Sequence, residues 1–173
     1  MKYNFETAPD RRGTGAFKWN SMYEAKPDVS DGVIPFSVAD MEFQNPQPLL
    51  DGMAKYVSQA VYGYTGPTHA YYESVINYMK RRHNWDIQKD WIITTPGVVP
   101  ALNELVKAFS EPGDGVIITR PVYYPFSMAI ENSGRKLVNV SLINRDGHYE
   151  MDFEGLEKAA KDPSTKLMIL CSP

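Results

Sequence analysis

The sequence has 173 residues, of which 43% are hydrophobic and 12% aromatic, and this is enough apolar material to bury a substantial core. Its formal net charge is -3 and no basic stripe is visible, which argues against a nucleic-acid partner. The single cysteine, Cys171, excludes an intrachain disulfide framework and is typical of a reducing compartment, so a cytoplasmic location is expected. The N-terminus lacks the apolar core of a signal peptide, and no window approaches the roughly 20 apolar residues of a membrane span.

Residues 1–44 are rich in glycine, proline, aspartate and aromatic residues and have no sustained periodicity. This composition predicts an extended arm. Because the arm carries Phe5, Phe17, Trp19 and Tyr23, we expect it to pack on the rest of the molecule or on a second subunit.

Two helices are predicted next. Apolar residues share one helical face at Leu49, Leu50, Met53 and Val57, after two prolines that suit a helix start. Turn residues at 62–67 interrupt the pattern, and a second amphipathic helix then runs to about Arg82, ending in the cations of residues 80–83, which complement the helix dipole.

From residue 91 onward strands alternate with helices. Strands are predicted at 91–94, 115–119, 136–140 and 166–171, and helices at 102–109, 124–132 and 153–160. This order predicts an α/β fold with a mainly parallel sheet covered on both faces, in which ligands bind at the carboxyl edge of the strands. The turn at 144–147 is expected to be an ordinary loop.

The segment Thr94 to Leu102 has the outline of an anion site. It joins a strand to a helix through Gly97 and places Pro100 in the first turn, where unpaired N–H groups and the helix dipole favour negative charge. A junction of this kind also serves merely to turn the chain, and the glycine patterns of nucleotide-binding loops are absent here.

A second informative segment, Thr119 to Phe126, directly follows the 115–119 strand. Tyr123 and Tyr124 would therefore fall at the same edge of the sheet as the anion site. A flat aromatic face beside phosphate-binding N–H groups suits a planar phosphorylated cofactor, although two packed tyrosines at a hydrophobic corner would give the same pattern.

The three histidines, His69, His83 and His148, are scattered without the spacing of a metal site, so no metal is predicted. Cys171 ends an apolar strand and is expected to be a buried hydrophobic side chain.

The ordered set of motifs resembles the cystathionine β-lyase or C–S lyase group of the aminotransferase superfamily, which are pyridoxal 5'-phosphate (PLP) enzymes of fold type I. The resemblance covers essentially the whole chain. Its blocks are Arg12-Gly13-Thr14 with Lys18-Trp19, Phe36 to Phe43, Tyr62-Gly63-Tyr64, Pro96 to Pro100, Pro121 to Phe126, and Cys171-Ser172-Pro173.

This resemblance implies a domain organisation and a cofactor site. Residues 1–44 would be an arm or part of the small domain, and residues 45–173 the N-terminal part of the PLP-binding large domain. The N–H groups of Val98 and Val99, after Gly97, would hold the cofactor phosphate. Tyr123 would stack on the pyridine ring, and Tyr124 would lie beside the reacting centre and assist proton transfer.

The resemblance also implies a homodimer and a substrate pocket. Tyr64 would reach across the dimer interface to the phosphate of the neighbouring cofactor. Val38, Ala39 and Asp40 would form a wall of the pocket near the carboxylate of the amino-acid substrate, although Asp40 could equally cap the following turn.

Several family residues would lie beyond Pro173, including the Schiff-base lysine and the arginine that binds the substrate carboxylate. The resemblance thus implies a chain cut short, which by itself cannot run PLP chemistry; a complete but degenerate product is the alternative. For the intact protein it implies β-elimination from an amino acid with sulfur on its β-carbon, releasing thiol, pyruvate and ammonia. An aminotransferase and a regulatory protein that retains the fold remain as alternatives.

Overall fold

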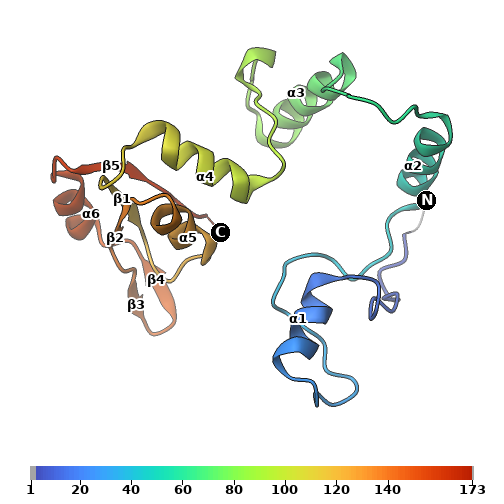
Figure 1. The fold of residues 1–173 in the computed structure, drawn as a ribbon, viewed down its shortest axis with the longest axis horizontal. Coiled ribbons are helices and arrows are strands. Elements are labelled where there is room, and N and C mark those ends of the chain that lie inside the picture. Colours follow the sequence, from blue (N-terminus) through green and yellow to red (C-terminus); the bar gives the residue numbers. More distant parts are fainter. Residues whose placement is uncertain (1–2, 173) are drawn as a thin grey trace. The chain divides into compact units, whose positions relative to one another are not determined.

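The computed structural model describes residues 3–172. The chain divides into two compact units, residues 1–65 and residues 66–173 (Figure 1). Within the described residues, no helix is both long enough and apolar enough to cross a membrane.

The first unit contains two helices, α1 (Phe17–Ala25) and α2 (Gln47–Gln59). The prediction of α2 is confirmed, with Pro48 in its first turn. The prediction of an extended arm is wrong for residues 17–25: α1 buries only Lys18, and Phe17 is 70% exposed, so this helix has no apolar face to reveal it in the sequence. Elsewhere in the arm, Phe5 packs edge to face on Phe43, with ring centroids 5.5 Å apart.

The second unit begins with α3 (His69–His83), as predicted. The hydroxyl of Thr68 accepts a hydrogen bond from the N–H of Tyr71 and caps the helix start, and Asn84 ends the helix in the left-handed conformation, with φ 49°. The predicted strand at residues 91–94 is wrong. A 3-10 turn, η1 (Lys89–Trp91), stands at its start, and the following residues pair with no described strand, leaving Ile93 85% exposed.

The predicted α/β fold with a mainly parallel sheet is confirmed. Its sheet contains β1 (Gly115–Ile118), β2 (Lys136–Asn139) and β5 (Thr165–Met168) in the order β2-β1-β5, with both pairings parallel. The connecting helices are α5 (Pro125–Asn132) and α6 (Phe153–Ala160), and α4 (Val98–Phe109) precedes β1. All of these elements lie within two or three residues of their predicted positions, apart from the earlier start of α4.

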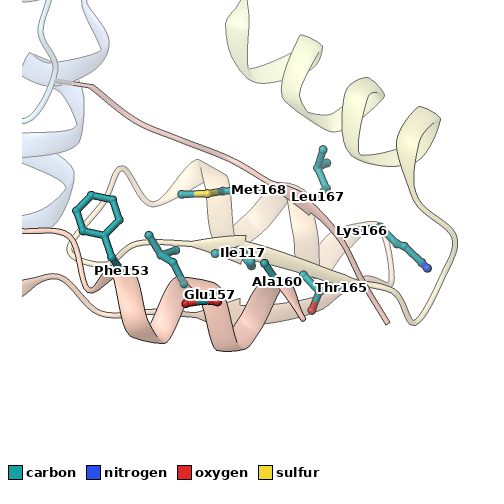
Figure 2. Close-up of a pocket in the computed structure, with 9 residues that line it drawn as sticks. Ile117, Phe153, Glu157, Ala160, Thr165, Lys166, Leu167 and Met168 are labelled. Carbon is teal, nitrogen blue, oxygen red and sulfur yellow. The ribbon is translucent and has the colours of Figure 1, made fainter. Parts of the chain in front are cut away.

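The central strand β1 has helices on both of its faces. Val116 and Ile118 are fully buried with Val106 of α4 and Ile130 of α5. Side chains alternate along a strand, so Ile117 points to the other face, where α6 lies. There it lines an open groove of about 530 Å³ between α6 and β5, with Phe153 and Met168 among its other walls (Figure 2).

The turn at residues 144–147 connects a short antiparallel hairpin that the sequence analysis did not predict. Its strands are β3 (Ile143–Arg145) and β4 (His148–Glu150). Asp146 and Gly147 both have positive φ, 50° and 90°, as the two-residue turn of a tight hairpin requires. The Asn144 side chain accepts a hydrogen bond of 2.8 Å from the Gly147 N–H.

Candidate functional site

The junction before α4 has the geometry of an anion site. Gly97 is the N-cap residue, with φ 138° and ψ 169°, a conformation that is essentially restricted to glycine. Thr95 donates a hydrogen bond of 3.0 Å from its hydroxyl to the Gly97 carbonyl. Within residues 3–172 the N–H groups of Val98 and Val99 have no backbone or side-chain acceptor, and Val98 is 75% exposed. Two free donors therefore stand at the positive end of a helix dipole.

The direction of α4 places this junction near the carboxyl end of β1. Residues 110–114 connect α4 to β1, and Val106 of α4 packs on Val116 and Ile118. The connection is short, and the helix packs on the strand that follows it. The helix must therefore run antiparallel to that strand. The start of α4 therefore lies toward the edge at which β1 ends, the edge where open α/β sheets bind ligands.

Both predicted tyrosines lie at this same edge. Tyr123 and Tyr124 lie on the connection from the end of β1 to α5. Their ring centroids are 5.2 Å apart, and the ring of Tyr123 also contacts that of Phe126. Tyr123 is 53% exposed and Tyr124 is 65% exposed, so both residues are open to a ligand. Tyr124 lines an open hollow of about 690 Å³ with residues that follow β1 and β2, among them Arg120 and Ser141. The structure thus brings the anion site and the tyrosines to one edge of the second unit.

The first unit contains the predicted substrate wall, Val38 to Asp40. Asp40 does not cap the following turn: its carboxylate forms ion pairs with Arg11, at 2.6 Å, and with Lys18, at 3.0 Å. Glu42 pairs with the same two cations, at 3.1 Å and 2.5 Å. We call Arg11, Lys18, Trp19, Asp40 and Glu42 the Lys18 cluster, because Lys18 is its buried centre, with only 4% of its surface exposed.

The Lys18 cluster shifts the titration of its own members. Hydrogen bonds from Lys18 and then Arg11 hold the pKa of Asp40 below its ordinary value. The hydrogen bond from Lys18 is likewise the main cause of the lowered pKa of Glu42. Conversely, the pKa of Lys18 is raised, chiefly by its hydrogen bond to Glu42. All four charges therefore persist throughout the neutral range.

Neither the pairing of Arg11 with Glu42 nor the burial of Lys18 is predicted from the sequence. The contacts of the cluster join residues 22 to 31 positions apart, so no local sequence pattern reveals them. The one available signal is that Lys18, Asp40 and Glu42 all lie in the motif blocks that carry the family resemblance. Tyr64, the predicted contact to a second subunit, is fully exposed, as expected of a residue with no partner in its own unit.

The remaining candidates are the possible metal ligands, Cys171 and the groove beside α6. Among residues 3–172 no group of histidine, cysteine and acidic side chains could hold a metal ion. Cys171 is partly buried against the core, with Leu167 and Val122. The groove in Figure 2 contains none of the predicted site residues.

Comparison with known proteins agrees with the predicted resemblance. The sequence pattern of the family "Aminotransferase class I and II" matches residues 32–173. The cystathionine beta-lyase PatB of Bacillus subtilis is 39% identical over 170 residues, which are 98% of this chain and 43% of that protein.

Solved structures give the same result. Cystalysin from Treponema denticola, whose crystal structure contains a pyridoxal 5'-phosphate cofactor, is 52% identical, with a TM-score of 0.96, over 100% of this chain and 44% of its own. The PLP-bound C–S lyase of Staphylococcus hominis is 30% identical, with a TM-score of 0.87, over 97% of this chain and 42% of its own.

The chain thus spans less than half the length of the relatives it matches, while their folds superpose on nearly all of it. A family match over most of the chain, the parallel sheet and the glycine-led start of α4 all agree, and the chain belongs to the aminotransferase class I and II family.

Proposed function

We propose that this chain forms part of a PLP-dependent C–S β-lyase, which releases thiol, pyruvate and ammonia from an amino acid with sulfur on its β-carbon. The observation that carries the proposal is the start of α4, where Gly97 leaves the N–H groups of Val98 and Val99 free at the helix N-terminus. Two of the relatives named above, a cystathionine beta-lyase and a C–S lyase, support the reaction class, and the cofactor in the cystalysin structure supports PLP.

The residues present fit the cofactor. The N–H groups of Val98 and Val99 would hold its phosphate, and the exposed face of Tyr123 would stack on its ring and keep it in plane. When bound, PLP supplies the electron sink that stabilises negative charge at the substrate α-carbon. Tyr124, 65% exposed and in contact with Tyr123, would hold or move a proton at its phenolic oxygen beside the reacting atoms.

The substrate wall and the second subunit complete the proposal. Val38, Ala39 and Asp40 would lie along the carboxylate side of the bound amino acid. Tyr64 would contact the cofactor phosphate of a partner subunit in a homodimer. In support of the dimer, α2 buries none of its residues within its own unit, and Tyr64 is fully exposed. A cytoplasmic location is proposed on the single cysteine.

Product analysis tests the reaction. The full protein is incubated with L-cystathionine or L-cysteine, with and without a 2-oxo acid acceptor, and pyruvate, thiol or sulfide, and ammonia are measured. We expect pyruvate and the sulfur product in equal amounts, independent of the acceptor. The lyase proposal would be overturned if no sulfur product were released and a keto acid formed only when the acceptor was present.

That second outcome would instead support an aminotransferase, the other candidate function. The match to the class I and II aminotransferase pattern favours it, since the same site serves both reactions. Tyr123→Leu is expected to weaken cofactor binding in either case, because its aromatic face is lost. Tyr149→Leu, on the hairpin strand β4, provides a control of similar exposure at a residue outside the predicted site.

A further inference from the structure

The Lys18 cluster surrounds the Lys18 ammonium group with one backbone carbonyl and two carboxylates. Lys18 Nζ donates to the backbone carbonyl of Asp40 at 2.8 Å, lies 3.0 Å from Asp40 Oδ1, and lies 2.5 Å from Glu42 Oε1. Three oxygen atoms thus lie within 3.0 Å of an ammonium group that has three protons to donate. The Lys18 side chain is 4% exposed, and its charge is matched by two carboxylates.

Arg11 closes the cluster from the other side. One guanidinium nitrogen donates to Asp40 Oδ2, and the other donates to Glu42 Oε1 and, at 3.3 Å, to the backbone carbonyl of Met41. The rigid fork of arginine thus bridges both acids. With Lys18 it balances two positive charges against two negative charges, and Trp19 Nε1 donates to the remaining oxygen of Glu42 at 3.3 Å.

These contacts fix backbone as well as side chains. The carbonyls of Asp40 and Met41 both accept hydrogen bonds from the cations, so the chain at residues 40–41 is tied to Lys18 on α1 and to Arg11. Residues 38–42 belong to no helix and no strand ladder; Met41 among them is 73% exposed, and the nearby Phe36 is 93% exposed. No strand ladder holds this segment, and the Lys18 cluster anchors its backbone at Asp40 and Met41.

We propose that Lys18 and Arg11 are positioning residues that hold the Val38 to Asp40 wall against the carboxylate of the amino-acid substrate. The inference rests on the proposed function, in which this wall borders the substrate. Its consequence is specific: loss of the cluster should weaken recognition of the carboxylate, while the cofactor site on α4, which contains none of these residues, should retain its affinity for PLP.

The test compares two variants of the full protein with a matched control. Lys18→Met keeps much of the side-chain length without the charge. Arg11→Gln removes the fork at a more exposed position, with 25% of the side chain accessible. Arg12→Met is the control, because Arg12 is the next cation in the arm and forms its ion pair with the exposed Asp10, outside the Lys18 cluster. Thermal melting and bound-cofactor absorbance establish that each variant is folded and loaded.

Two readouts distinguish positioning from a general structural role. The first is steady-state kinetics, where we expect Lys18→Met to raise KM for the amino acid by about tenfold or more with kcat within a factor of about three. The second is the carboxylate preference, which is the affinity for an unreactive amino acid divided by the affinity for the matching amine without a carboxylate. Both affinities are measured from the change in cofactor absorbance. We expect both variants to lose much of this preference and Arg12→Met to keep it.

The outcomes separate the inference from the proposed function. If the unmodified protein releases no thiol, the lyase proposal fails. The carboxylate preference then still tests whether Lys18 and Arg11 position the Val38 to Asp40 wall. If the unmodified protein is active but both variants keep the KM and carboxylate preference of Arg12→Met, the positioning role is wrong. A fall in kcat and in PLP occupancy with no change in carboxylate preference would also overturn it. Should Lys18→Met fail to fold, Arg11→Gln decides by the same criteria.

Discussion

Replacement of Gly97 by alanine tests the anion site at the start of α4. Gly97 has φ 138° and ψ 169°, and a non-glycine residue held in this region costs about 1–3 kcal/mol. The added Cβ would lie 3.7 Å from Pro100 Cδ, an ordinary contact, so the cost arises from the backbone rather than from crowding. If the backbone relaxes to avoid this strain, the Val98 N–H turns away from the phosphate.

The expected loss is therefore a weaker affinity for PLP in the full protein. A cost of about 1–3 kcal/mol corresponds to a dissociation constant raised roughly 5- to 150-fold. Fluorescence titration of the apoprotein with PLP measures the dissociation constant. Urea denaturation measures how much of the strain energy lowers the free energy of unfolding instead of weakening PLP binding.

Gly134→Ala is the matched control. Gly134 also has a positive φ, 74°, with nothing within 4 Å of an added Cβ, but it follows α5 at the opposite end from Tyr123. We expect it to lower stability by about 1–2 kcal/mol and to leave PLP affinity unchanged. The reasoning would be refuted if Gly97→Ala bound PLP as tightly as the unmodified protein, or if Gly134→Ala weakened binding equally.

Three further predictions concern stability. Asp152→Ala removes the side chain that accepts a hydrogen bond of 2.9 Å from the Gly155 N–H at the start of α6. It should lower the free energy of unfolding, measured in urea, by about 0.5–2 kcal/mol. An unchanged free energy of unfolding would show that the cap contributes nothing. Ile130→Ala should cost about 2–5 kcal/mol because Ile130 is fully buried, against a change within about 0.5 kcal/mol for the exposed neighbour Glu131→Ala. The lowered pKa values of Asp40 and Glu42 mean that their contribution is present above their ordinary values of 3.8 and 4.5 and is lost as pH falls through the lowered values. Trp19 fluorescence should therefore report an acid transition that begins as pH falls below the ordinary pKa value of 4.5 for Glu42, and a transition near neutral pH would contradict the ion pairs.

The elements that could be predicted from the sequence are those with a clear period or an uninterrupted apolar run. The buried strand β1 is apolar from Val116 to Ile118, and α4 places Leu102 and Val106 on one face. Both signals come from burial against the same core. The α/β order then followed from the alternation of strands and helices.

The elements that could not be predicted are stabilised by other means. Helix α1 is anchored through the charge of Lys18, so it has no apolar face for a periodicity to reveal. The run Trp91 to Thr94 is apolar enough for a strand, yet no described strand pairs with it, and a strand exists only through its neighbours. The hairpin at Asp146-Gly147 has the expected turn residues, but its strands are too short and too exposed to show alternation.

The candidate site divides in the same way. A glycine between an apolar run and a helical pattern is a local signal, and it located Gly97 and the free N–H groups after it. The Lys18 cluster is non-local: its ion pairs join residues 22 to 31 positions apart, and charge alone does not reveal which acid meets which base. Only the folded backbone identifies these partners.

The most direct test of the central claim is an absorbance spectrum of the full protein before and after reduction with borohydride. A PLP enzyme of this family should show a visible band from lysine-bound cofactor. Borohydride should abolish the band and leave the cofactor covalently attached. Without borohydride, the Gly97→Ala protein should lose the band on dilution more readily than the unmodified protein. A protein that is folded and supplied with PLP yet shows no such band would contradict the assignment of this chain to a PLP enzyme.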